Sequence, residues 1–126
     1  MKAFRIAAAL LASSWLATSP AFAQSAPAKA GNAVNGKKLF TADGCYLCHG
    51  REGQGGSAAP IGSYGPRLAP PKLSVEAIRL YVRHPSGGMP PFNAKVLSDA
   101  DIDDIYSFLK TIPAPPPVKD IPLLNQ

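Results

Sequence analysis

Apolar residues recur at helical spacing in three stretches of the chain, and each stretch is bounded by residues that cap or end helices. The last stretch is the clearest. Ser98 and Asp101 form a capping-box pair at its start, and Pro113 ends it. Between these limits the apolar side chains fall at intervals of three and four residues, at Ile102, Ile105, Tyr106 and Leu109. The pattern predicts a helix that begins after Ser98 and stops before Pro113.

The first stretch predicts a helix over Ala33–Asp43, with Asn32 as its N-cap and Gly44 at its end. Gly36 and Phe40 share one face of it. A glycine inside a helix costs about 1 kcal/mol relative to alanine. We expect the close approach of another helix at Gly36 to compensate.

The second stretch predicts a helix from Val75 to about His84, capped by Ser74 and ended by Pro85. Its apolar face carries Ile78, Tyr81 and Val82. Arg79 and Arg83 lie on a different face, where we expect solvated side chains.

Four aspartates crowd the N-terminal half of the last helix: Asp99, Asp101, Asp103 and Asp104. Negative charge there suits the helix dipole. We expect a solvated face, with a docking patch for a partner as the alternative.

The remaining segments predict loops, a leader and a tail. Residues 50–65 carry six glycines, without the strand and Lys-Ser/Thr sequence of a phosphate-binding loop. Residues 1–23 combine a basic start, an apolar run and an Ala-Phe-Ala cleavage site, which is typical of a secretory signal peptide. We expect a flexible lead-in over 24–31, one domain over 32–112 and an extended Pro-rich tail over 113–126, whose Ile121, Leu123 and Leu124 pack on the domain or on a partner.

Composition narrows the class of protein. The net charge of the 126 residues is +5, and removal of Lys2 and Arg5 with the leader lowers it to +3. No basic stripe with interleaved aromatic residues is present, so nucleic-acid binding is not expected. The leader predicts export to the bacterial periplasm, with no stable membrane span after its cleavage.

The two cysteines lie in one motif, Cys45-Tyr46-Leu47-Cys48-His49. This C-x-x-C-H spacing is the attachment signal for c-type haem. Two thiols three residues apart can form thioether bonds to one haem, and the following histidine can bind its iron through an imidazole nitrogen. The alternatives are a thioredoxin-like redox pair, half of a zinc site or a plain disulfide.

The predicted second iron ligand is Met89, which follows two glycines and precedes two prolines in a constrained loop. Its thioether is a soft ligand, and His/Met ligation is usual in cytochromes c. A methionine that only fills a gap in the core is the alternative. His84 is the rival ligand, since it is the only other histidine in the chain.

Over about residues 32–112 the chain resembles the class I c-type cytochromes, in their bacterial single-haem form. The matching features are the haem motif, the glycines after it, Gly65-Pro66 with Leu68, and Met89-Pro90. The resemblance implies a small all-α haem cage of about three to four helices with long loops. It also implies that the Pro66 carbonyl accepts a hydrogen bond from His49, that Leu68 packs on the haem, and that Phe40 meets Tyr106 where the first and last helices cross.

The function implied is that of an electron carrier and not of an enzyme. One covalently bound haem c, with iron held by His49 and Met89, would pass single electrons between periplasmic redox proteins. The expected donor is a dehydrogenase or reductase, and the expected acceptor is an oxidase or another cytochrome. Two alternatives stay open: a subunit permanently bound to a periplasmic dehydrogenase, and a haem enzyme or gas sensor with an open distal site.

Overall fold

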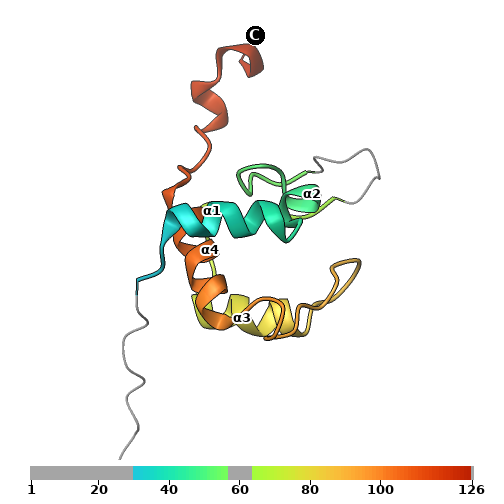
Figure 1. The fold of residues 1–126 in the computed structure, drawn as a ribbon. Coiled ribbons are helices and arrows are strands. Elements are labelled where there is room, and N and C mark those ends of the chain that lie inside the picture. The colour runs from blue at the N-terminus through green and yellow to red at the C-terminus, as the bar shows by residue number, and fades with distance from the viewer. Residues whose placement is uncertain (1–29, 57–63, 126) are drawn as a thin grey trace, which may run out of the picture.

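The structure, a computed structural model, describes residues 30–56 and 64–125. Within these residues the chain is helical and contains no strand (Figure 1). The helices are α1 (Ala33–Ala42), α2 (Cys45–His49), α3 (Val75–Arg83) and α4 (Asp99–Thr111), followed by the 3₁₀ turns η1 (Val118–Asp120) and η2 (Pro122–Leu124). This confirms the predicted all-α fold. The predicted signal peptide lies outside the described residues, as does all of the predicted lead-in except its last two residues.

The helix boundaries follow local capping chemistry. Asn32, Ser74 and Ser98 each accept hydrogen bonds from the first backbone N–H groups of the helices that they precede. Ser98 and Asp101 complete the predicted capping box. These N-caps confirm the three predicted helix starts.

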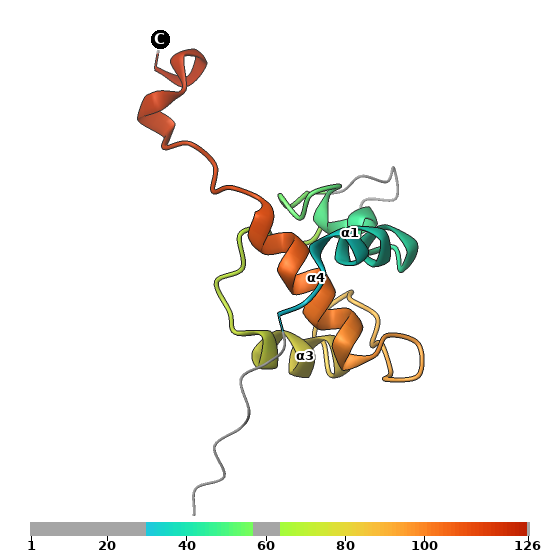
Figure 2. The same ribbon diagram turned by 60° about the vertical axis from the view of Figure 1, so that its left-hand side comes forward.

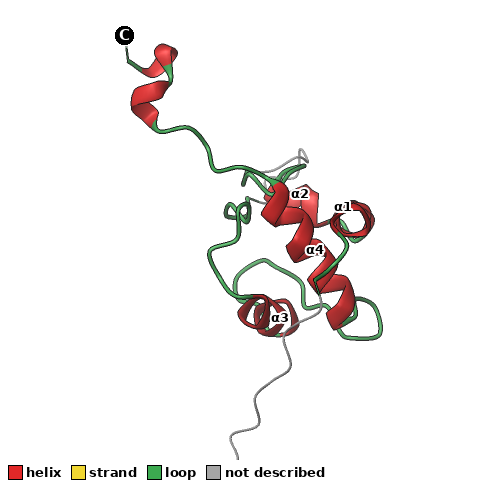
Figure 3. Cartoon of the chain, turned by 90° about the vertical axis from the view of Figure 1, so that its left-hand side faces the viewer, coloured by secondary structure: helices red, strands yellow, loops and turns green. Residues whose placement is uncertain are grey.

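Helix α4 is the central element of the domain. Figures 2 and 3 show α1 crossing it on one side and α3 packing on the other. At the crossing, a Cβ atom on Gly36 would overlap the carbonyl oxygen of Asp104. A Cβ atom on Gly31 would likewise lie too close to the backbone of Asp103. The predicted close helix contact at Gly36 is therefore confirmed, and the close approach already begins at Gly31, two residues before α1.

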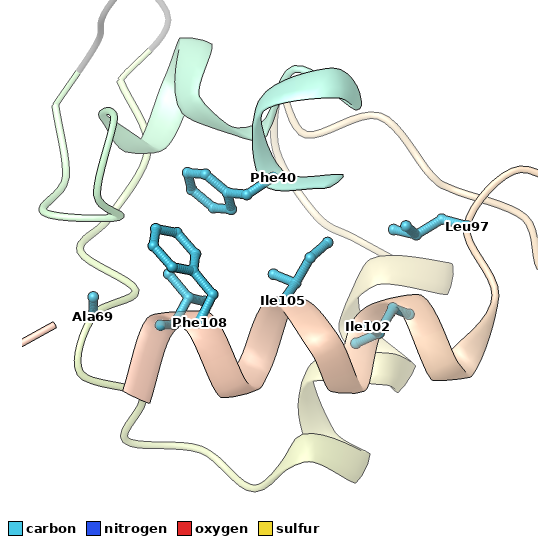
Figure 4. Close-up of a cluster of buried hydrophobic side chains, with 7 residues drawn as sticks. Phe40, Ala69, Leu97, Ile102, Ile105 and Phe108 are labelled. Atoms are coloured by element: carbon cyan, nitrogen blue, oxygen red, sulfur yellow. The ribbon is translucent and has the colours of Figure 1, made fainter. Parts of the chain in front are cut away.

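The core lies along the inner face of α4 (Figure 4). Phe40 from α1 faces Phe108 from α4, with ring centroids 5.7 Å apart and ring planes inclined by 56°. This is a correction to the expected meeting of Phe40 with Tyr106. Tyr106 lies on the flank of the helix, where its hydroxyl donates a hydrogen bond to the carbonyl oxygen of Leu73.

The aspartates of α4 form structural connections, which corrects the expected solvated face for all of them except Asp99, whose side chain stays 64% exposed. The docking patch for a partner stays a prediction. Asp104 accepts hydrogen bonds from the backbone N–H of Asn32 (2.6 Å) and from the side chain of Asn35 (2.8 Å), which ties α4 to α1. Asp101 serves the capping box. The other two form ion pairs with α3, in the pairs Arg79–Asp103 and Arg83–Asp99. The two arginines are therefore not the freely solvated side chains that their spacing suggested.

The C-terminal tail leaves the domain beside the end of α4 (Figures 1 and 3). It is not wholly extended, because η1 and η2 form there and the side chain of Asn125 donates hydrogen bonds to the carbonyl oxygens of Val118 and Ile121. The two turns contact each other and none of the helices α1–α4. Leu123 and Leu124 are exposed, so the expectation that they pack on the domain was wrong. No helix within residues 30–56 and 64–125 has the length and apolar character needed to cross a bilayer.

Candidate haem site

The three residues of the haem motif lie on one face of α2, a single helical turn that the apolar periodicity did not predict. Cys45, Cys48 and His49 stand at helical positions i, i+3 and i+4, which project from the same side. Left-handed glycines bracket the turn, with φ of 75° at Gly44 and 78° at Gly50. These two positions let the chain enter and leave a five-residue helix abruptly. Both thiols are half-buried, while His49 is buried.

The ring of His49 is oriented by a backbone carbonyl acceptor. Its Nδ1 lies 2.8 Å from the carbonyl oxygen of Pro66, as the resemblance implied. A carbonyl oxygen can only accept, so Nδ1 carries the proton and donates. Neutral imidazole then presents its unprotonated Nε2 as the ligand atom, and the hydrogen bond also makes that nitrogen more basic.

Gly65 brings the Pro66 carbonyl to the ring. A Cβ atom at Gly65 would lie 2.5 Å from Nδ1 of His49 and 2.8 Å from the carbonyl oxygen of Cys48. The backbone N–H of Gly65 donates to that same Cys48 oxygen at 2.7 Å. The loop backbone therefore lies flat against the motif helix, at a distance that excludes any side chain.

Two of the glycines after the motif form backbone hydrogen bonds that hold the loop against His49 and against the segment that follows Pro66. The N–H of Gly55 donates to the His49 carbonyl oxygen at 2.8 Å, and the carbonyl oxygen of Gly53 accepts from the N–H groups of Leu68 (2.8 Å) and Ala69 (3.0 Å). Ala69 is fully buried, and Leu68 packs partly against the core. Leu68 thus lies on the segment that holds Pro66 in place.

The state of Cys45 argues against the alternative uses of the cysteines. Burial, together with the nearby Asp43 carboxylate, raises the pKa of the Cys45 thiol to about 11. A raised thiol pKa disfavours the thiolate that a thioredoxin-like nucleophile requires. Both cysteines are free thiols in the structure. Within the part of the chain that the structure describes, no strand flanks the motif and no group of three or more Cys, His, Asp or Glu side chains could hold a metal ion.

Met89 lies on the loop 85–92, which connects α3 to the segment before α4. In Figure 1 this loop extends from the end of α3, on the same side of the molecule as α2, with α2 above it. The Met89 side chain is half-buried. His84 is the C-cap of α3 and is exposed. Of the two candidates for second ligand, Met89 has the more enclosed side chain.

One feature of this loop escaped the sequence analysis. Arg83 donates a hydrogen bond to the carbonyl oxygen of Phe92 at 3.0 Å, at the far end of the loop that carries Met89. A signal for it was present, because Arg79 and Arg83 are four residues apart, as are Asp99 and Asp103. Matched spacing of opposite charges on two helices is what an antiparallel pairing of those helices requires.

A shallow groove of about 790 Å³ lies elsewhere on the described surface. It runs between α1 and the end of α4, next to the start of the tail, and its lining includes Val34, Thr41 and Phe108. It contains no cysteine, histidine or methionine. The groove therefore offers no iron ligand and is separate from the candidate haem site.

The residues at the candidate site fit a covalently attached haem. Two half-buried thiols on one helical face, a histidine with a free Nε2 and a half-buried methionine on a separate loop are the donor set that such a group needs. Pro66 and Leu68 belong to the loop that supports the histidine.

A family model described as "Cytochrome C oxidase, cbb3-type, subunit III" matches residues 31–109. The curated protein "Cytochrome c-555" of Methylococcus capsulatus is 32% identical over 87 residues, which cover 64% of this chain and 66% of that protein. The chain thus matches slightly less than two thirds of the length of this relative. No solved structure matches the chain significantly.

Proposed function

Because this chain belongs to the c-type cytochromes, in the family described as cytochrome c oxidase, cbb3-type, subunit III, we propose that it carries single electrons between redox proteins of the bacterial periplasm. Family membership confirms haem c as the cofactor. Members of the family transfer electrons and are not enzymes, in agreement with the expectation from the sequence. The residues that bind the iron, the cellular compartment and the redox partners are proposed in addition.

The observation that carries the proposal is the hydrogen bond from Nδ1 of His49 to the Pro66 carbonyl oxygen. It sets the tautomer that leaves Nε2 ready to bind iron. In the proposal Cys45 and Cys48 form the thioether bonds, His49 is the proximal ligand and Met89 is the distal ligand. Bound haem c supplies an iron that changes its oxidation state by one electron. The chain's own residues would orient the ligands, and with both His49 and Met89 bound to the iron no position would be left for a substrate.

The proposed setting is the periplasm, reached by means of the signal peptide proposed for residues 1–23. The expected donor is a dehydrogenase or reductase, and the expected acceptor is an oxidase or another cytochrome. The donor would be oxidised and the acceptor reduced by one electron, without the making or breaking of a covalent bond.

A second candidate is a permanent subunit of a larger redox complex, such as a periplasmic dehydrogenase. Two observations favour it. The family description is that of an oxidase subunit, and the tail presents Leu123 and Leu124 to solvent, away from the domain. Isolation of the tagged native protein separates the two candidates, because a free carrier elutes alone and a subunit elutes with stoichiometric partners.

The test of the first proposal uses the purified holoprotein. We expect the haem to stay with the polypeptide in a denaturing gel and to resist acid-acetone extraction. We expect a reversible one-electron titration, and no carbon monoxide binding by the reduced protein. Complete extraction of the haem would reject covalent attachment, and rapid carbon monoxide binding would favour a haem enzyme or gas sensor with an open distal site.

A further inference from the structure

The loop that carries Met89 is tied to α3 at its far end through both backbone groups of Phe92. The N–H of Phe92 donates to the carbonyl oxygen of Val82 at 3.0 Å. The carbonyl oxygen of Phe92 accepts from Nη1 of Arg83, also at 3.0 Å. The chain therefore leaves α3 at Arg83 and returns to the same helical turn at Phe92, which closes the loop at its base.

Arg83 connects this loop to a third element. Its Nη2 donates to Oδ1 of Asp99, the first residue of α4, at 2.6 Å. The side chain of Arg83 is only 17% exposed, while that of Asp99 is 64% exposed. The planar guanidinium thus reaches two acceptors from two separate nitrogens in a fixed geometry, whereas an ammonium group would have to reach both from one nitrogen.

The interior of the loop has fewer restraints. Gly87 adopts a left-handed φ of 68°, and a Cβ atom at either Gly87 or Gly88 would meet nothing within 4 Å. Ser86 is held by the hydroxyl of Tyr81, with the two side-chain oxygens 2.9 Å apart. Met89 lies between the Ser86 anchor and the Phe92 anchor, so its position depends on both.

We propose that Arg83 is a positioning residue for Met89, which it holds at the haem iron by fixing the Phe92 end of the loop. This rests on the proposed function, in which Met89 is the distal ligand. The physical argument is that a ligand on a loop leaves the metal when the loop opens, and opening costs more when the base of the loop is hydrogen-bonded to a charged donor.

The chain contains a matched control one helical turn earlier. Arg79 pairs with Asp103 through Nε at 3.0 Å and through Nη2, and its side chain is 26% exposed. This pair joins the same two helices as Arg83 and Asp99, with no hydrogen bond from Arg79 to the loop among those that the structure describes. Arg79→Ala therefore removes a connection between α3 and α4 and leaves the Phe92 anchor in place.

The experiment measures how readily added imidazole displaces the distal ligand from oxidised holoprotein, followed by the loss of the weak sulfur-to-iron absorption band. We expect Arg83→Ala to bind imidazole about tenfold more tightly than the wild type, the equivalent of losing one hydrogen bond from a charged donor. We expect Arg79→Ala to stay within roughly twofold of the wild type. Urea unfolding of both variants shows whether their losses of stability are similar.

Equal imidazole affinities in the two variants, or an unchanged affinity in Arg83→Ala, would overturn the proposal. If Arg83→Ala does not incorporate haem, Arg83→Lys is used for the same measurement. This variant keeps the positive charge but has one nitrogen in place of the two that bind Phe92 and Asp99. A shift toward tighter imidazole binding in Arg83→Lys supports the guanidinium role, and wild-type affinity overturns it. Met89→Ala distinguishes this result from failure of the ligand assignment: imidazole binding unchanged from the wild type in that variant would show that Met89 is not the ligand.

Discussion

Gly65 lies so close to His49 that a Cβ atom on it would be 2.5 Å from Nδ1 of the imidazole. The contact has no freedom to relax, because the N–H of Gly65 is also bonded to the Cys48 carbonyl oxygen at 2.7 Å. The backbone of the loop therefore packs directly against the imidazole ring of His49, the proposed proximal ligand. This contact holds the Pro66 carbonyl oxygen within hydrogen-bond distance of Nδ1.

Gly65→Ala is expected to destabilise the holoprotein by about 2 kcal/mol, since overpacking of a tight contact typically costs 1–3 kcal/mol. Urea unfolding followed by far-ultraviolet circular dichroism measures the change. Gly88→Ala is the matched control, because a Cβ atom there meets nothing within 4 Å and its backbone is not left-handed. Equal destabilisation of the two variants would contradict the role given to Gly65.

Met89→Ala is expected to abolish the weak sulfur-to-iron absorption band and to lower the reduction potential. The physical reason is that a thioether stabilises reduced iron relative to oxidised iron. Optical spectra and a redox titration of the purified protein measure both effects. His84→Ala is the control, because this exposed helix C-cap is expected to change neither. An unchanged spectrum in Met89→Ala, with a changed one in His84→Ala, would make His84 the ligand.

Asp43 is expected to give the stability of the protein a pH dependence in the acid range. Burial, with a smaller contribution from Asp101, raises the pKa of Asp43 above its ordinary value of 3.8. One of its oxygens is buried without a hydrogen-bond partner among the described residues. Over the window between the ordinary and the raised pKa, the folded state binds more protons than the unfolded state. The free energy of unfolding therefore falls as the pH rises through that window.

Asp43→Asn should remove this fall and should be more stable than the wild type at neutral pH. Part of the gain, about 0.5 kcal/mol, comes from removing a negative charge at the C-terminus of α1, where it opposes the helix dipole. Urea titrations at a series of pH values measure both effects. Asp120→Asn is the control, because Asp120 lies in the exposed tail. If the free energy of unfolding depends on pH in the same way in Asp43→Asn and in the wild type, the Asp43 carboxyl is not the origin of the pH dependence.

Truncation after Ile112 is expected to leave haem incorporation, the visible spectrum and the thermal midpoint unchanged, because η1 and η2 contact none of the helices of the domain. The exposed apolar residues of the tail suit contact with a redox partner, so we expect slower oxidation of the reduced protein by native membranes. Oxidation by ferricyanide is the control, since a small oxidant needs no docking segment. If native membranes oxidise both forms at the same rate, the tail is a passive linker.

The amino-acid sequence was sufficient for whatever depends on neighbours within about four residues. Asn32, Ser74 and Ser98 identified the three helix starts, because a cap bonds to N–H groups two or three residues away. The haem motif was recognisable for the same reason, since two thiols and an imidazole must reach one cofactor from adjacent positions. The helical form of α2 was not predictable in this way, because five residues are too few to show a period.

Only the tertiary structure determines which side chains of different helices are in contact. Phe108, and not Tyr106, faces Phe40 because the rotation of α4 about its axis is set by the close crossing at Gly36. The aspartates of α4 and the arginines of α3 looked like solvated charges, since each pair is separated by 16 or 24 residues of chain. The packing of α3 against α4 brings Arg83 within reach of Asp99, and the closing of the loop onto α3 brings it within reach of Phe92. Local periodicity defines the face on which a side chain lies, and the packing of helices determines what that face contacts.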